Sequence, residues 1–351
     1  MLPRALSSPP HTPRPRPPGN DDAMNTMPGR RAFFATRTLI ALALFSATPC
    51  AMAEPGHKFD PLSSEDIRKI ACAIPAQAQA RPKQPRRLLI FYRAEGYVHA
   101  SIPYANEAFG QLGAHTGAYT AEISDDMGVF TPQRLARYDA VLFNNTTELN
   151  FADPAQRQAL LDFVARGKGV IGIHAASDSF YTWPEGQALL GGQFKSHPWT
   201  AKDTVAVKLD DPAHPLVAAF AGKGFWIRDE IYQIVGSYSR SSQRVLLSLD
   251  MSQPENARPP DMIVRSDNDF PIAWIRQQGR GRVFYTSLGH NPELYETRQI
   301  LQHYLDGIQY ALGDLRALSE SSATLPHPAT PALAPRATDG SVNHLNPVPC
   351  S

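Results

Sequence analysis

Histidine and carboxylate side chains follow several apolar runs that are typical of buried strands. The most informative run is Val170–Ile173, which ends directly in His174 and is followed by Asp178. An imidazole exchanges protons near neutral pH and is also the commonest metal ligand, and a carboxylate can act as its partner. Because open α/β sheets bind ligands beyond the carboxyl ends of their strands, this position predicts a chemical site.

Three further histidines occupy comparable positions. His99 lies in the loop after the first apolar run, His290 follows the last one, and His197 lies between aromatic residues, 23 positions after His174. A lone histidine is more often a hydrogen-bonded structural residue, but four at one expected sheet edge favour a common site. We predict His99, His174 and His290 as catalytic groups. No close histidine or cysteine pair with metal-ligand spacing occurs, so a divalent metal would need ligands from separate loops.

Two adjacent carboxylates, Asp229 and Glu230, lie in a strand-like segment that continues to Tyr232. On a strand, Glu230 and Tyr232 share one face while Asp229 points to the other. A carboxylate and a phenol on one face could bind sugar hydroxyls, or act as a base and a proton donor. Glu230 is therefore the fourth predicted catalytic group, and a solvated strand face is the alternative interpretation.

Polar and aromatic side chains around the histidines suit a carbohydrate. Aromatic rings stack on the C–H face of a sugar, and carboxylates bind its hydroxyl groups; a packed aromatic cover over the sheet is the alternative. The residues that we predict to bind substrate are Ser177, Asp178, Tyr181, Trp183, His197, Trp199, Asp229 and Tyr232.

Strands and helices alternate through the first part of the folded region. Buried strands are predicted near residues 88–92, 119–123, 140–143 and 170–173. This alternation predicts a doubly wound, mostly parallel α/β sheet. After about residue 200, shorter alternating strands separated by turn residues predict a β-rich insertion that returns to the main sheet. A helical pattern over about 293–312 closes the domain.

The chain is expected to divide into four segments. They are an N-terminal extension with an export signal (1–53), a linker or pre-domain segment (54–85), one α/β domain (86–315) and a disordered Pro/Ala/Ser-rich tail (316–351). Arg30-Arg31 before a short apolar run, with small residues at Ala51 and Ala53, is typical of an export signal cleaved after Ala53. The Arg-Arg-x-Phe-Phe pattern resembles a twin-arginine motif. We therefore expect a periplasmic or secreted protein.

The charge and the cysteine content limit the kinds of partner that we expect for this protein. With 34 basic and 33 acidic residues the net charge is +1, and no basic stripe is interleaved with aromatic residues, so no nucleic-acid partner is expected. The N-terminal apolar run is too short for an integral membrane segment. Cys72 and Cys350 are too few for a disulfide framework, although export would allow them to pair. The oligomeric state has no signal in the sequence.

Several ordered motifs carry a family resemblance. They are Tyr97–Pro103, Gly172–Pro184, Leu190–Trp199, Asp229-Glu230-x-Tyr232, Pro271–Trp274 and Gly281–His290. Together they resemble the trehalose-utilisation (ThuA-like) family over about residues 86–313. The resemblance implies a flavodoxin-like, class I glutamine-amidotransferase-like fold and a role in the metabolism of disaccharides or their keto forms. Amidotransferases of this fold place a cysteine nucleophile after a central strand. Here that neighbourhood holds His174, and residues 73–349 contain no cysteine, which excludes thiol amidotransferase chemistry.

Two functions of different classes stay open at this point. The first is an enzyme acting on a small-molecule carbohydrate, with His99, His174 and His290 moving protons, Glu230 as their carboxylate partner and a divalent metal as an optional electrophile. The alternative is a non-catalytic periplasmic carbohydrate-binding module, which would use the same aromatic and acidic side chains. A structural or interaction domain without a working site is a third interpretation.

Overall fold

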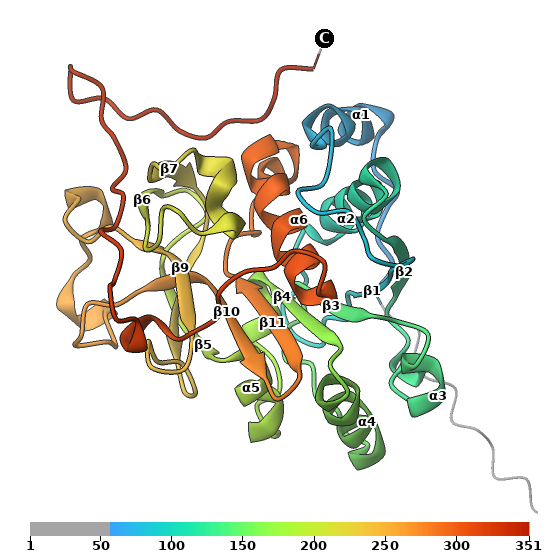
Figure 1. Ribbon diagram of the computed structural model, residues 1–351. Coiled ribbons are helices and arrows are strands. Elements are labelled where there is room, and N and C mark those ends of the chain that lie inside the picture. Colours follow the sequence, from blue (N-terminus) through green and yellow to red (C-terminus); the bar gives the residue numbers. More distant parts are fainter. Residues whose placement is uncertain (1–56, 351) are drawn as a thin grey trace, which may run out of the picture. The chain divides into compact units, whose positions relative to one another are not determined.

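A computed structural model describes residues 57–350 (Figure 1), so the expected export signal lies outside the described residues. The α-helices are α1 (Ser64–Ala73), α2 (Ile102–Thr116), α3 (Pro132–Leu135), α4 (Pro154–Ala165), α5 (Pro184–Leu190) and α6 (Arg298–Leu312). The first strands are β1 (Arg87–Phe91), β2 (Thr120–Ser124), β3 (Ala140–Asn144), β4 (Gly169–Ile173), β5 (Gln193–Trp199) and β6 (Thr204–Leu209). The remaining strands are β7 (Phe225–Arg228), β8 (Ile231–Val235), β9 (Arg244–Leu249), β10 (Pro271–Gln278) and β11 (Gly281–Thr286).

Nine strands form one sheet in the order β2-β1-β3-β4-β11-β10-β9-β6-β7. Neighbours from β2 to β11 are parallel, and those from β11 to β7 are antiparallel. A separate two-stranded sheet pairs β5 with β8. The protein is therefore a mixed α/β protein with a large central sheet, most of whose strands point the same way.

Helices cover both faces of the parallel half of the sheet. Alternate side chains of β1 point to opposite faces of the sheet. Leu88 and Ile90 belong to the apolar core between the sheet and α1, α2 and α6. Leu89 and Phe91 belong to the core between the sheet and α3, α4 and α5. In Figure 1 the first helix set lies above the sheet and the second below it. Strands β3 and β4 are buried along their whole length, which explains their nearly continuous apolar sequences.

The segment expected as a linker contributes to the core. Helix α1 begins at an N-cap, Ser63, whose side chain accepts a hydrogen bond from the Asp66 amide. Its Ile70 and Ala73 are fully buried in the core shared with α2 and α6. This part of the segment is therefore a helix that packs on the domain.

The C-terminal segment differs from the expectation of disorder. Its chain follows the domain surface, where Ala332 and Leu209 exchange two backbone hydrogen bonds of 2.9 Å. The amide of Leu345 donates to the carbonyl of Trp226, and Cys350 forms a disulfide with Cys72 in α1. A Pro/Ala/Ser-rich segment has too few apolar residues for a core of its own, but main-chain hydrogen bonds and one covalent link attach it to the domain.

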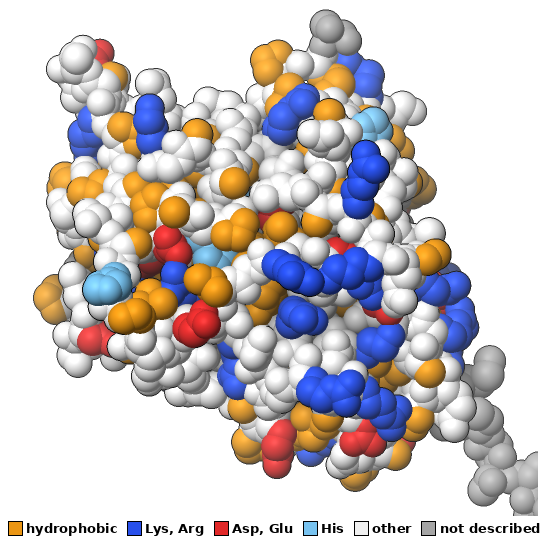
Figure 2. Space-filling model, viewed as in Figure 1, with side chains coloured by type: hydrophobic (Ala, Val, Ile, Leu, Met, Phe, Trp, Pro, Cys, Tyr) orange, Lys and Arg blue, Asp and Glu red, His pale blue; other side chains and the backbone are white. Residues whose placement is uncertain are grey.

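Basic side chains gather on one part of the surface, over the region that carries β3, β4 and α4 in Figure 1 (Figure 2). Basic residues directly before two strands are paired with carboxylates: Arg86, before β1, lies 2.7 Å from Asp314, and Lys168, before β4, lies 2.8 Å from Asp139. Within residues 57–350, no helix is both long and apolar enough to cross a membrane.

Candidate functional site

All four predicted catalytic side chains converge beyond the carboxyl ends of the parallel strands. His99, His174, His290 and Glu230 each offer a donor atom, and these atoms all lie within 4.8 Å of one another. Oε1 of Glu230 lies 3.3 Å from Nδ1 of His290 and 3.6 Å from Nε2 of His174. We call these four residues the histidine–glutamate cluster. Three imidazoles and one carboxylate could share protons or hold a divalent metal ion.

His174 occupies a strained position at the end of β4. Its φ is 48°, a left-handed backbone that non-glycine residues rarely adopt, and it starts a short 3₁₀ turn that ends at Ser177. Strain of this kind recurs where a strand-to-helix turn aims a side chain at a site. Nδ1 of His174 lies 2.5 Å from the carbonyl oxygen of Ser287, and Nε2 lies 2.8 Å from the hydroxyl of Tyr232. Tyr232 of β8 and Ser287, directly after β11, therefore position the two ring nitrogens.

The backbone amides on both sides of His290 are fixed by hydrogen bonds to one carboxylate. The fully buried carboxylate of Asp229 accepts hydrogen bonds from the amides of Gly289 (2.8 Å) and Asn291 (2.9 Å). Gly289 has a φ of 141°, and a Cβ there would lie 2.8 Å from the hydroxyl of Tyr295. Only glycine suits this turn, because a side chain would be strained in conformation and would also clash.

Glu230 enters the cluster from outside the parallel strands. It lies in the connection between β7 of the large sheet and β8 of the small sheet. Its Oε2 lies 3.2 Å from Nδ1 of His197, a half-exposed residue on β5. Burial would raise the pKa of Glu230, but the imidazoles of His174 and His290 outweigh burial and hold its pKa well below the ordinary value. Glu230 is therefore a carboxylate at neutral pH.

The cluster is electrostatically asymmetric. Burial, reinforced by His174 and His290, lowers the pKa of His99 to about 2, so its imidazole is neutral. Burial also lowers the pKa of His290, but the carboxylates of Glu230 and Asp229 more than offset it and raise the pKa above the ordinary value. One neutral imidazole and one imidazole with a raised pKa thus lie next to the same carboxylate.

Exposed aromatic and acidic side chains lie around the cluster. Tyr97 is 64% exposed, and its ring packs edge-on against His99 with centroids 4.8 Å apart. Tyr181 is half-exposed and donates a short hydrogen bond to Asp178. Burial raises the pKa of Asp178, and the hydrogen bond from Tyr181 offsets only part of that increase. Tyr97, Tyr181 and Asp178 remain available to a ligand.

The other residues predicted to bind substrate are less accessible. Ser177 is buried, and its hydroxyl pairs with that of Tyr285 at 2.7 Å. Trp183 belongs to the apolar core and packs against Phe151 and Phe180. Trp199 is fully buried, and its indole N–H donates to the carbonyl of Asn256. The structure therefore places both tryptophans in the core, as in the alternative interpretation of an aromatic cover.

Some residues of the site had no strong sequence signal. Ser287 supplies only a backbone carbonyl, which no side-chain pattern reveals. The hydroxyl of Tyr285 donates to the carbonyl of His174 at 2.8 Å. Asn145 follows β3 with a φ of 50°, and its buried Oδ1 has no hydrogen-bond partner among the described residues. Its position directly after a strand, equivalent to that of His174, was the signal that could have identified it.

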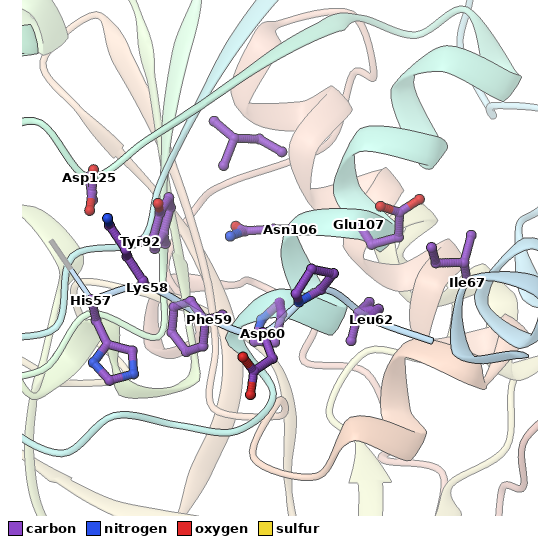
Figure 3. A pocket seen from close by; sticks show the side chains of 13 residues that line it. His57, Lys58, Phe59, Asp60, Leu62, Ile67, Tyr92, Asn106, Glu107 and Asp125 are labelled. Carbon is purple, nitrogen blue, oxygen red and sulfur yellow. The ribbon is translucent and has the colours of Figure 1, made fainter. Parts of the chain in front are cut away.

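Two cavities open near this edge of the sheet. One of about 540 Å³ is lined by His197, Phe194, Pro198, Met262 and their neighbours, so His197 lies between this cavity and Glu230. A second, of about 760 Å³, lies at the ends of β1 and β2 and is lined by Tyr92, Asn106 and Asp125 among others (Figure 3). No member of the histidine–glutamate cluster lines the second cavity.

Comparison with known proteins agrees with this fold. A ThuA-like protein of Bacteroides uniformis ATCC 8492 has 24% identity and a TM-score of 0.52, over 66% of this chain and 93% of that one. A ThuA-like protein of Parabacteroides merdae ATCC 43184 has 16% identity and a TM-score of 0.50, over 66% and 92%. No curated protein matched. The profile of the trehalose utilisation (ThuA) family matches residues 87–311, which span every strand and the histidine–glutamate cluster. The chain therefore belongs to the trehalose utilisation (ThuA) family.

Proposed function

We propose that this protein is an exported enzyme that acts on a carbohydrate, and that its substrate is a disaccharide or glycoside carrying a keto group. The observation that carries the proposal is the convergence of His99, His174, His290 and Glu230 at one sheet edge, beside exposed Tyr97 and Tyr181. The name of the family supports a sugar as the substrate, and the acid–base chemistry of the cluster supports this type of reaction.

The keto group of such a substrate makes proton abstraction at the neighbouring carbon possible. A C–H bond next to a carbonyl loses its proton to a base, and the electron pair moves onto the carbonyl oxygen to give an enediolate. Return of the proton at the neighbouring carbon yields an isomer, and expulsion of a glycosidic oxygen yields an elimination product. Both outcomes need a proton carrier and a positive centre facing the oxygen. The histidine–glutamate cluster can supply both.

The fold supports the location of this site. We propose that β2, β1, β3, β4 and β11 form a flavodoxin-like, class I glutamine-amidotransferase-like unit, and that residues 193–278 are an insertion into it. Strand order β2-β1-β3-β4-β11 supports the first part, since doubly wound sheets of this order bind ligands beyond their strand ends. The insertion brings Glu230 and His197 to that edge.

The experiment uses the purified protein, a panel of disaccharides and their 3-keto derivatives, and added divalent metals, in D₂O. Proton NMR should show loss of the signal next to the carbonyl, followed by a new product. His174→Ala and Glu230→Gln should lower the rate at least 100-fold. His115→Ala, at an exposed histidine of α2, is the matched control and should leave the rate unchanged.

Two results would change the assignment. No exchange and no product with any keto-sugar, with metals supplied, would refute the enzyme. Saturable broadening of sugar signals without turnover would then identify a carbohydrate-binding module. In that case Tyr97→Ala and Tyr181→Ala should weaken binding, because these aromatic side chains are exposed beside the cluster.

Export is part of the same proposal. The Arg30-Arg31 motif motivates it, and the disulfide between Cys72 and Cys350 supports an oxidising compartment such as the periplasm. Fractionation of cells should recover a shortened chain in the periplasm or the medium, beginning at Glu54. Lys substitution of both arginines should retain the precursor in the cytoplasm if the twin-arginine route is used. An unprocessed wild-type chain in the cytoplasm would contradict export.

A further inference from the structure

We propose that His99, His174, His290 and Glu230 bind one divalent transition-metal ion. This inference deepens the proposed function, on which the role of the ion in turnover rests, but the site itself is argued from geometry. The four side chains come from four separate parts of the chain: the loop after β1, the end of β4, the β7–β8 connection and the turn after β11.

The spacing of the donor atoms matches a single ion. Metal–ligand bonds of about 2.0–2.2 Å around a tetrahedral centre place neighbouring ligand atoms about 3.3–3.6 Å apart. Oε1 of Glu230 lies 3.3 Å from Nδ1 of His290 and 3.6 Å from Nε2 of His174. The full set lies within 4.8 Å, so small side-chain movements complete the coordination.

An unsatisfied nitrogen is the second observation. His99 is only 4% exposed, and its Nδ1 has no hydrogen-bond partner among the described residues. The ring of His99 faces the cluster, with centroids 4.9 Å from His174 and 5.1 Å from His290. A buried polar atom without a partner costs free energy, and coordination of the His99 ring to an ion removes that cost.

The surroundings of the four side chains orient them as ligands. A carbonyl can only accept, so Nδ1 of His174 donates its proton to Ser287 and leaves the lone pair on Nε2. Nδ1 of His197 contacts Oε2 of Glu230, so Oε1 is the oxygen that faces the cluster. Asp229 holds both sides of the His290 turn. Metal sites commonly position their ligands through such outer contacts.

The ligand types select the class of ion. Three imidazoles and one carboxylate suit Zn²⁺, Mn²⁺, Fe²⁺, Co²⁺ or Ni²⁺, whereas Mg²⁺ and Ca²⁺ prefer oxygen ligands only. With four protein ligands in a tetrahedral arrangement, the ion would expand to five ligands when a sugar oxygen binds. Such an ion would polarise a substrate carbonyl, the positive centre that the proposed reaction needs. His197, outside the ligand set, would then be free to carry protons.

One hydrogen bond competes with the ion. The hydroxyl of Tyr232 donates to Nε2 of His174 at 2.8 Å, and a cation bound there would need the same lone pair. The Tyr232→Phe substitution removes this competing hydrogen bond and replaces none of the four ligand side chains. It should therefore retain or tighten metal binding, whereas a purely structural role of Tyr232 in the site would weaken it.

The test measures metal binding directly. The purified protein is stripped with chelator, titrated with Zn²⁺, Co²⁺ and Mn²⁺ by calorimetry, and assayed for metal content by mass spectrometry. We expect one ion per chain, and visible absorption from bound Co²⁺. His99→Ala, His290→Ala and Glu230→Gln should weaken binding at least 30-fold. His115→Ala, at an exposed histidine far from these ligands in the sequence, is the matched control and should change it less than threefold.

A measurement on the wild-type chain guards against variants that fail to fold. Bound Co²⁺ or Mn²⁺ should broaden or shift the imidazole NMR signals of His99, His174 and His290, but not those of His115. No binding tighter than about 10 μM by any of the three ions, or full binding in the three ligand variants, would overturn the inference. One bound ion without turnover of any keto-sugar would refute the proposed function and leave the metal site standing. Turnover by protein shown to be metal-free would support the proposed function and refute the role of the ion in turnover.

Discussion

The hydroxyl of Tyr232 lies 2.8 Å from Nε2 of His174, a buried imidazole whose Nδ1 lies 2.5 Å from the carbonyl of Ser287. Because a carbonyl cannot donate, Nδ1 carries the proton, and the phenol must donate to Nε2 when the ring is neutral. Burial raises the pKa of Tyr232 well above its ordinary value, so the hydroxyl keeps the proton that it donates. The tautomer of His174 is thus determined by Tyr232 of β8 and by Ser287, the residue that follows β11.

This relationship predicts an NMR signature. In chelator-treated protein, ¹⁵N shifts of the neutral ring of His174 should show the proton on Nδ1 and the lone pair on Nε2. Tyr232→Phe should keep that tautomer, because Ser287 still accepts from Nδ1, while the Nε2 shift moves toward that of a free lone pair. The opposite tautomer in the wild type would contradict the arrangement.

Replacement of Gly289 by alanine should damage both stability and the site. A side chain there would adopt an unfavourable φ of 141° and would lie 2.8 Å from the hydroxyl of Tyr295 and 3.2 Å from Cβ of His174. We expect the free energy of unfolding to fall by at least about 2 kcal/mol. Gly110→Ala is the matched control: it lies in α2 with open space around its Cβ, and should stabilise by about 0.5–1 kcal/mol. Urea denaturation compares the two, and equal effects would contradict this account.

Asp229 should act as a positioning residue for His290. In Asp229→Asn, one of the two oxygens that accept from Gly289 and Asn291 becomes a donor, so one hydrogen bond is lost in a buried site. We expect a loss of about 1–3 kcal/mol in stability and a 10- to 100-fold loss in metal affinity. A purely structural residue would lower stability without changing the affinity of the folded protein, which calorimetry below the unfolding transition distinguishes.

The disulfide should hold the C-terminal segment on the domain. Cys72 and Cys350 are 278 residues apart, so the bond constrains nearly the whole described chain. A loop of this length corresponds to at most about 5 kcal/mol of stabilisation. Reductant should lower the melting temperature and expose the segment after Leu315 to proteases. Cys72→Ser and Cys350→Ser should behave alike and show no further response to reductant; two different responses would argue against the pair.

Asp306 predicts a specific pH dependence of stability. Burial raises its pKa to about 7, and hydrogen bonds from Gln302 and Gln79 only partly offset the increase. Between the unfolded value near 4 and this folded value, the folded state binds more protons, so stability falls as pH rises through this window. Asp306→Asn should therefore gain stability relative to the wild type from pH 4 to 8, by at most about 4 kcal/mol. The exposed Asp261→Asn is the control, and parallel curves for Asp306→Asn and the wild type would refute the prediction.

The local sequence was sufficient to predict the parallel strands and the placement of three histidines. The apolar run of β4 ends directly at His174, and His99 and His290 follow β1 and β11. Parallel strands bring their carboxyl ends to one edge, so residues that follow them meet without any knowledge of side-chain packing. The cluster of imidazoles was therefore foreseeable from strand ends alone.

The sequence predicted Glu230 as the carboxylate partner of those histidines, but only the tertiary structure decided how Glu230 reaches them. Glu230 reaches them because the chain passes from the large sheet to the small one between β7 and β8, and a strand pattern does not say which sheet a strand joins. Burial of Trp183 and Trp199 depends on neighbours far along the chain, as does the attachment of the C-terminal segment through Cys72. Short-range periodicity reports which face of an element is apolar, whereas contacts between distant segments arise only when the elements pack.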